Sequence, residues 1–309
     1  SIIILIPILI VALIFFSFTQ TSQYEWWLVT HGFLQHFLIF IFVVFTNNAV
    51  NDKKYSIKLY ALITIINLIN LIIDNHFALL GNFAIILVLT IPVIFDKKNR
   101  RKFIIIIVLM TFCIAIGVTI ISFLPVVSTS NQFDFLQSLN LLFSNLIKTS
   151  KSVGIAFLSG IFNFDFLSSK LGVPLQLWEI LSIPVLLLFL LNLAFFFQQK
   201  IYIKSIFPGF LMLYSLVFMF SVLLIRYNPT QERGIFCLSW DRYIVIYQFG
   251  LIGFFWNILL MIPKIKFIRK ITPKTKYLSL SFFAIILFLN WGLHFNEALK
   301  RGSYLINVY

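Results

Sequence analysis

The chain has 309 residues, of which 61% are hydrophobic, 18% are aromatic and only 11% are charged. A soluble domain usually carries about a quarter charged residues. The 38 Phe and a mean hydropathy of +1.00 leave too little polar surface to coat a water-soluble globule of this size. These values exclude a cytosolic enzyme and an intrinsically disordered protein, and two Cys exclude a disulfide scaffold. What remains is a membrane protein with many spans.

The formal net charge is +14, from 24 Lys and Arg against 10 Asp and Glu. On a soluble protein this excess would favour nucleic-acid binding. Here the cations stand in short clusters between long apolar blocks, which is typical of cytoplasmic loops that face anionic lipid. We therefore expect membrane lipid, and no nucleic acid, as a partner.

Apolar blocks that can cross a bilayer recur along the whole chain, which predicts a single transmembrane domain over residues 1–309. A span needs about 20 mostly apolar residues, and it must be helical because lipid offers no partner for backbone N–H and C=O groups. The candidate spans are residues 2–18, 28–46, 57–73, 77–95, 103–125, 176–197, 205–225, 243–262 and 278–293. The predicted fold is an all-α, polytopic bundle of about nine transmembrane helices.

The loops between these spans alternate in charge. Those near residues 52–58, 96–102, 200–204 and 264–276 hold 16 cations and two acids, whereas the other loops and the C-terminal tail hold eight of each. The positive-inside rule assigns the 16-cation set to the cytoplasm. The predicted orientation has the N-terminus inside and the C-terminus outside, with the long loop 126–175 and the loop 226–242 on the outer face.

The outer loop 126–175 contains two apolar segments that are too short to span the membrane. Between residues 133 and 148, large apolar side chains recur at steps of three and four, which predicts an amphipathic helix in the outer headgroup layer. The segment from Gly154 to Phe166 is predicted to be a re-entrant or surface helix. Both segments either form a lid over the bundle or border a groove for a lipid substrate.

The outer loop before the eighth span is the densest polar cluster of the sequence. Arg226, Arg233 and Arg242 stand there on the side of the membrane that topology does not require to be basic. Arg suits bidentate binding of phosphate or carboxylate. We interpret these three residues, Asp241 and Tyr243 as substrate-binding residues. The alternative is interfacial snorkelling of the arginines with local ion pairs.

Acid–base candidates lie at the outer ends of earlier spans. Glu25 just precedes the second span, His31 lies in its outer half, and Asp74 forms the tip of a short outer turn. Each is a candidate catalytic residue, because a carboxylate or an imidazole there can activate a hydroxyl. The alternatives are a bundle residue for His31 and a solvated turn for Asp74. His31 and His36 lie about 140° apart on an ideal helix and predict no shared metal-binding face.

The sequence from Arg233 to Gly250 resembles a late-loop signature of bacterial envelope-glycan membrane proteins, including GT-C-type glycosyltransferases. Arg233-Gly234, Phe236 and Trp240-Asp241-Arg242-Tyr243 run into an apolar span, and residues 291–305 are similar to the outer tail of the same group. The resemblance implies transfer of a sugar from a polyprenyl-phosphate donor at the outer face. It also implies an acid of the first outer loop as base or metal ligand, and here Glu25 is that loop's one acid.

The expected function is therefore that of a glycosyltransferase of cell-envelope glycan assembly, in the bacterial plasma (inner) membrane. Glu25 or Asp74 would activate the acceptor hydroxyl or hold a divalent cation such as Mg²⁺ or Mn²⁺. Two alternatives stay open. One is an O-antigen-type polysaccharide polymerase or ligase, and the other is a non-catalytic structural subunit with partner membrane subunits. Loss of one sugar, loss of long-chain polymer, or purification of a stoichiometric complex would distinguish the three.

Overall fold

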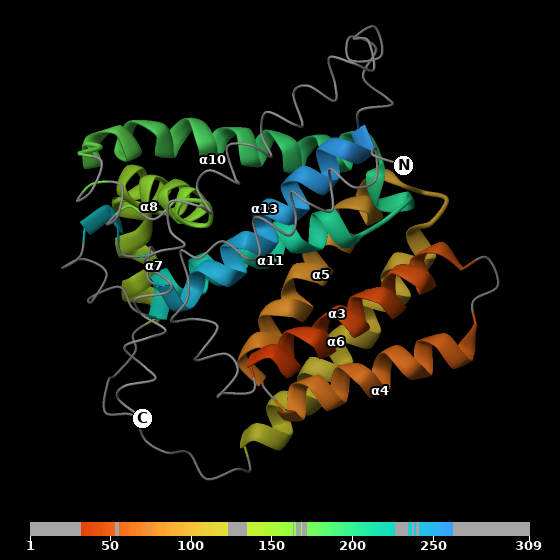
Figure 1. Cartoon of the computed structure of the whole chain (residues 1–309). Helices are drawn as coiled ribbons and strands as arrows, with labels where there is room; N and C mark the ends of the chain where they lie inside the picture. The colour runs from red at the N-terminus through yellow and green to blue at the C-terminus, as the bar shows by residue number, and fades with distance from the viewer. Residues whose placement is uncertain are drawn as a thin grey trace, which may run out of the picture.

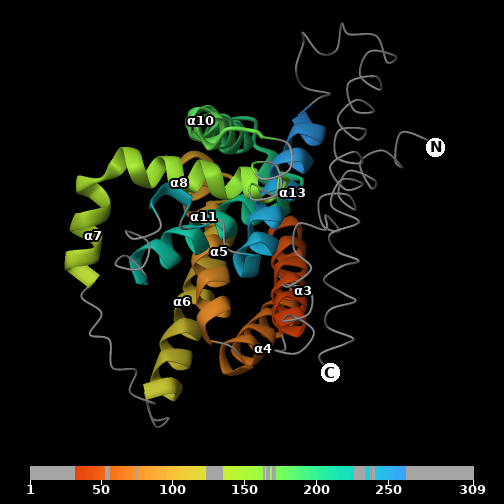
Figure 2. The ribbon, with the colours of Figure 1, turned by 60° about the vertical axis from the view of Figure 1, so that its left-hand side comes forward.

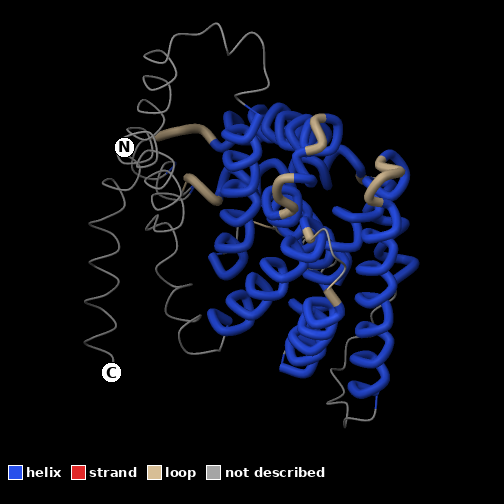
Figure 3. Tube along the Cα trace, turned by 90° about the vertical axis from the view of Figure 1, so that its right-hand side faces the viewer, coloured by secondary structure: helices blue, strands red, loops and turns tan. Residues whose placement is uncertain are grey.

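The computed structural model describes residues 32–52, 56–73, 75–122, 135–162, 164, 168, 172–225, 234–236, 238 and 241–261. In this part of the chain the structure is all-helical and has no strand (Figure 3). The helices are α3 (Gly32–Asn51), α4 (Ile57–Ile73), α5 (Asn75–Phe95), α6 (Arg100–Ser122), α7 (Phe135–Ser144), α8 (Leu146–Ser159), α10 (Leu175–Gln198), η2 (Ile201–Ile203), α11 (Phe207–Ile225), η3 (Gly234–Phe236) and α13 (Asp241–Met261). The predicted all-α class is confirmed.

Four helices in the described ranges are long and apolar enough to cross a membrane. They contain Phe77–Phe95, Arg100–Thr119, Leu175–Gln198 and Phe207–Leu224. Shorter apolar stretches occupy α3, α4 and α13. These seven helices coincide with seven predicted spans, and the predicted spans 2–18 and 278–293 lie outside the described residues. The length and composition of the helices are those of a membrane protein.

The helices pack in successive layers around α11 (Figures 1 and 2). α13 covers one side of α11 and α5 covers another, while α6 and the pair α3 and α4 continue the bundle beyond α5. On the other flank α8 and α10 pack together and contact α13. α11 is the most buried of the four long apolar helices. The outermost helix α4 leaves Ile65 and Ile72 exposed, as expected for a surface that faces lipid.

Small residues bring the central helices close together. A Cβ atom at Gly253 of α13 would lie 2.7 Å from the carbonyl oxygen of Pro208 in α11. A Cβ atom at Gly250 would collide with the side chain of Ser215. Lipid chains are as apolar as the protein interior, so membrane helices associate through such close packing rather than through hydrophobic burial. The α11–α13 contact therefore depends on glycine at these two positions.

Buried amide groups join other helix pairs. Asn67 of α4 and Asn82 of α5 exchange two reciprocal side-chain hydrogen bonds of 2.7 Å. Asn257 of α13 donates to the backbone and side-chain oxygens of Asn192 in α10, at 2.8 and 2.9 Å. An amide inside an apolar bundle is costly unless it finds a partner, so each pair fixes the register of two helices.

One end of the bundle, which we call the basic end, collects the turns α3–α4, α5–α6 and η2. Lys102 at the start of α6 donates to the backbone oxygen of Asp52 after α3, and the backbone N–H of Ile206 donates to the Asn47 side chain at 3.0 Å. Loops of the predicted 16-cation set therefore meet in space. The opposite end, which we call the pocket end, carries α7, α8, η3 and the start of α10 (Figure 1).

The structure corrects the prediction for the long outer loop. The predicted amphipathic helix 133–148 is two helices, α7 and α8, which meet at a corner at Asn145 (Figure 2). The predicted re-entrant or surface segment 154–166 begins inside α8, where every residue from Ser152 to Ser159 is buried. Periodicity suggested one surface helix, but the packing of α8 between α10 and α13 supplies burial that periodicity does not encode.

Candidate functional site

Most of the residues predicted to form the site lie outside the described residues. These are the catalytic candidates Glu25, His31 and Asp74 and the arginines Arg226 and Arg233. The backbone of Asp241, Arg242 and Tyr243 forms the first turn of α13, at the pocket end, as the predicted mouth of a span requires. The predicted substrate-binding and catalytic roles of all eight residues stay predictions.

The described parts of the loop between α11 and α13 pack onto the pocket end. Ile235 and Phe236 of η3 join a cluster with Trp178 of α10 and Leu158 of α8. Leu238 is fully buried. The described residues Ile235 and Phe236 therefore anchor this loop against α8 and α10.

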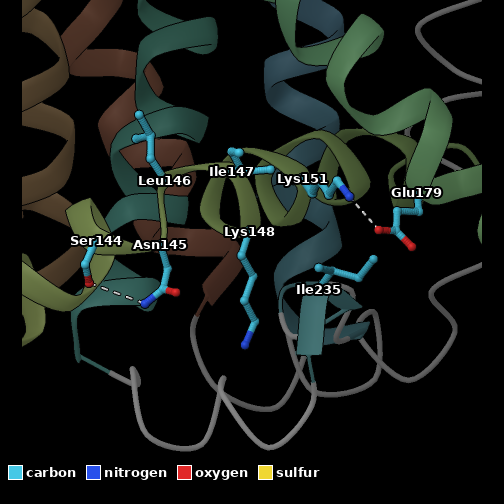
Figure 4. A pocket seen from close by; sticks show the side chains of 8 residues that line it. All are labelled: Ser144, Asn145, Leu146, Ile147, Lys148, Lys151, Glu179 and Ile235. Atoms are coloured by element: carbon cyan, nitrogen blue, oxygen red, sulfur yellow. Dashed lines mark hydrogen bonds and ion pairs between the residues drawn. The ribbon is translucent and has the colours of Figure 1, made fainter.

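An open pocket of about 600 Å³ lies beside this anchor. It is formed by the α7–α8 corner, the first two turns of α8, the second turn of α10 and η3 (Figure 4). Its lining residues are Ser144, Asn145, Leu146, Ile147, Lys148, Lys151, Glu179 and Ile235. The described part of the lining thus combines two cations and one carboxylate with apolar walls.

Lys148 and Lys151 stand three residues apart on α8; in Figure 4 the Lys151 side chain points toward Glu179 and the Lys148 side chain points away from it. The Lys151 ammonium forms an ion pair of 2.5 Å with the Glu179 carboxylate of α10. The two side chains keep 27% and 40% of their surface exposed. Because water reaches both groups, this pair contributes little to stability and its partners can exchange.

A close contact between α8 and α10 positions this ion pair. Gly154, one turn after Lys151, lies against the backbone carbonyl of Ser182, one turn after Glu179, and a Cβ atom at Gly154 would collide with that carbonyl. The Ser182 hydroxyl in turn donates to the Glu179 carbonyl oxygen at 2.6 Å. The absent side chain at Gly154 thus lets the two helices approach closely enough for their charged groups to meet.

The α7–α8 corner is stabilised locally. The Asn145 amide donates to the Leu141 carbonyl oxygen at 3.0 Å, and the Asn145 N–H donates to the same oxygen at 3.2 Å. The corner leaves Phe143, Leu146 and Ile147 largely exposed. Exposed large apolar side chains beside a polar pocket are typical of a surface that lies in the membrane interface.

This arrangement suits an amphipathic anion. Two ammonium groups can hold a phosphate or carboxylate, and the exposed apolar side chains at the rim can contact an acyl or isoprenoid chain. Divalent cations instead prefer several oxygen ligands. Glu179 is the one carboxylate in the described lining, and the described residues contain no group of three His, Cys, Asp or Glu suited to a metal ion.

Sequence reasoning missed Lys148, Lys151 and Glu179 as site residues. The available signal was two lysines three residues apart on the predicted outer side, where topology does not require positive charge. Glu179 stands 28 residues after Lys151, so only the packing of α8 on α10 brings the two together.

A buried histidine lies inside the bundle, away from the pocket. His36 of α3 is 2% exposed, and its Nε2 atom lies 3.2 Å from the Tyr214 hydroxyl of α11. The rings of Phe77 and Phe249 lie 5.0 and 5.5 Å from the His36 ring. Such a histidine, hydrogen-bonded and enclosed by aromatic rings, has the geometry of a structural bundle residue.

No family model matches the sequence, and no curated protein or solved structure is significantly similar to it. The function therefore has to be argued from the chemistry of the chain itself.

Proposed function

We propose that this protein is a membrane-embedded, glycosyltransferase-like enzyme of cell-envelope glycan assembly. Its substrate would be a sugar linked to polyprenyl phosphate, which it would meet at the outer face of the bacterial plasma membrane. In this proposal the chain has nine spans, its N-terminus is inside and its C-terminus is outside.

One observation carries the proposal. The described residues of the arginine-containing loop, Ile235 and Phe236, pack beside a pocket that unites charged groups with exposed apolar side chains. A polyprenyl-phosphate-linked sugar has the same two parts, an anionic headgroup and a long apolar chain. Positioned cations opposite the phosphate would stabilise the charge that develops as the sugar leaves it.

The topology supports the same assignment. The loops of the predicted 16-cation set that the structure describes gather at the basic end, which the positive-inside rule assigns to the cytoplasm. The pocket end would then face outwards. Lipid-linked glycan donors that have been flipped across the membrane present their headgroups on that side.

The decisive experiment replaces Arg233 and Arg242 by Ala, separately, in a strain that lacks its own copy of the gene. Because each would lose a charge held against the phosphate, we expect envelope glycan to fall at least about tenfold while protein levels in the membrane are unchanged. The matched control is Arg101→Ala at the basic end, which should leave the glycan intact. Unchanged glycan in both outer-loop variants would overturn the proposal.

The product identifies the type of reaction. A single missing sugar would support a glycosyltransferase, whereas loss of long-chain polymer with intact lipid-linked repeat units would support the polymerase or ligase alternative. Unchanged glycan combined with purification in a stoichiometric complex would instead support a structural subunit.

A further inference from the structure

The pocket is lined by charged residues other than the predicted arginines. Its described lining includes Lys148 and Lys151 of α8, Glu179 of α10, and Leu146, Ile147 and Ile235. We propose that this pocket is a binding site for the phosphate of a membrane lipid, held by Lys148 and Lys151, and that the phosphate takes the place of Glu179 on Lys151.

The two lysines supply the recognition of the anion. They lie three residues apart on α8, and both line the pocket together with Glu179, the one carboxylate among its described lining residues (Figure 4). Lysine binds phosphate as a mobile point charge with three donors. A phosphate monoester at neutral pH carries between one and two negative charges, which two ammonium groups can balance.

The rim supplies the recognition of the lipid chain. Leu146 and Ile147, at the α7–α8 corner, are 59% and 70% exposed, and Phe143 of α7 is 67% exposed. These side chains adjoin the lysines in sequence and would gain from contact with an apolar chain. A soluble phosphate has no part that could use them, so the surface selects a lipid.

Glu179 competes with the phosphate for Lys151 and so lowers the affinity of the site. In the structure its carboxylate is the partner of Lys151, at 2.5 Å, and both groups reach solvent. An entering phosphate would be repelled by Glu179 and attracted by Lys151, so binding requires the ion pair to open. Removing the charge of Glu179 should therefore strengthen binding, which a residue with a merely structural role would not do.

This inference deepens the proposed function and rests on it for the choice of an isoprenoid phosphate as the first probe. Binding and sugar transfer are measured separately. If the protein binds lipid saturably but the arginine variants leave envelope glycan unchanged, the proposed function is wrong and the binding site is supported. If the arginine variants lose envelope glycan but no lipid binds at the pocket, the proposed function is supported and the binding site is wrong.

The test measures lipid binding to the purified full chain in detergent by native mass spectrometry and by ligand-induced thermal shift. The probes are undecaprenyl phosphate, phosphatidylglycerol, inorganic phosphate and undecaprenol, the last being the same chain without phosphate. We expect one of the two lipid phosphates to bind saturably. Which one binds identifies the source, and neither inorganic phosphate nor undecaprenol should match it.

The variants assign the binding to these residues. Lys148→Gln and Lys151→Gln should each weaken binding about tenfold, and Glu179→Gln should tighten it about threefold. Lys98→Gln, an exposed lysine at the basic end, is the matched control and should bind as the wild type does. Thermal unfolding without lipid checks that each variant is folded.

Three results would overturn the inference. The first is wild-type binding by the double variant Lys148→Gln/Lys151→Gln. The second is an equal loss of binding in Lys98→Gln. The third is binding of undecaprenol or inorganic phosphate as tight as that of the lipid phosphates.

Discussion

Two buried charged residues at the basic end and the ion pair at the pocket end are held in opposite ways. At the basic end Asp96 and Lys102 are only 7% and 8% exposed. Asp96 accepts hydrogen bonds within the α5–α6 turn, and Lys102 donates to the Asp52 carbonyl oxygen after α3. At the pocket end Lys151 and Glu179 remain partly exposed beside an open pocket. Buried, hydrogen-bonded charges are costly to disturb, whereas partly exposed pairs contribute little to stability. Burial therefore distinguishes Asp96 and Lys102, which hold turns of the fold in place, from the solvent-exposed pair of Lys151 and Glu179.

The reason for the difference is local geometry. The Asp96 carboxylate accepts hydrogen bonds from the backbone and side chain of Asn99, and Arg100 donates to the carbonyl oxygens of Val93 and Ile94 at the end of α5. These contacts satisfy backbone groups that a helix end leaves without partners. At the pocket end the α7–α8 corner turns away from α10 and leaves space between them (Figure 2).

The largest effect should come from Gly154→Ala, which tests how the pocket end is assembled. The new Cβ atom would collide with the Ser182 carbonyl, so α8 must move away from α10 at a cost of about 3 kcal/mol. The measurement is thermal unfolding of the protein in detergent. Gly81→Ala is the control, because its Cβ atom would meet Ile39 at an ordinary 3.4 Å. Equal stability of both variants would contradict the close α8–α10 contact.

A smaller loss is expected at the basic end for Lys102→Met. The variant keeps the apolar stem and loses the hydrogen bond to the Asp52 carbonyl oxygen, which should lower the free energy of unfolding by about 1–3 kcal/mol. Lys98→Met changes an exposed lysine of the same turn and should stay within about 0.5 kcal/mol of the wild type. SDS-induced unfolding measures both variants. If their free energies of unfolding are equal, the buried Lys102 does not stabilise the fold.

At the pocket end Glu179→Gln should change stability by less than about 1 kcal/mol, because its ion pair with Lys151 is exposed to solvent. The same unfolding assay used for Lys102→Met measures this variant. If Glu179→Gln loses as much stability as Lys102→Met, the exposed ion pair stabilises the fold as much as the buried lysine does, and the contrast between the two is wrong.

The smallest effect concerns pH. Burial, followed by the charge of nearby Asp96, raises the pKa of Tyr202 in η2. The folded state then keeps this proton at a pH where the unfolded state has lost it, so stability is fully present below about pH 10 and declines above it. Tyr202→Phe should unfold with a weaker pH dependence in this alkaline range. Identical alkaline slopes for the two proteins would show that folding does not raise the pKa of Tyr202.

Much of the helical framework follows from the sequence. Apolar blocks of the right length predicted the positions of α3, α4, α5, α6, α10, α11 and α13, because a bilayer demands helices of about 20 residues. The clustering of cations in alternate loops also indicated which turns share an end. The corner at Asn145 was missed, because an apolar period of three to four residues continues through it and gives no sign of a change in direction.

The candidate site was far less predictable. The sequence pointed to the arginine loop but not to Lys148, Lys151 and Glu179, because the two lysines and the carboxylate lie on different helices. α10 is apolar on nearly every face, so its sequence does not predict which helix packs against it. For this reason no pattern in the sequence predicted that α8 would lie against α10.

By itself, the sequence determined that this chain is a bundle of apolar helices with its cations sorted between alternate loops, because the bilayer acts on each segment separately. Only the tertiary structure decided which helices touch and which charges meet. Lipid and protein interior are equally apolar, so that choice depends on close contacts such as Gly154 against Ser182 and on amide pairs such as Asn192 and Asn257. These contacts join residues far apart in the chain, and they place Lys151 beside Glu179.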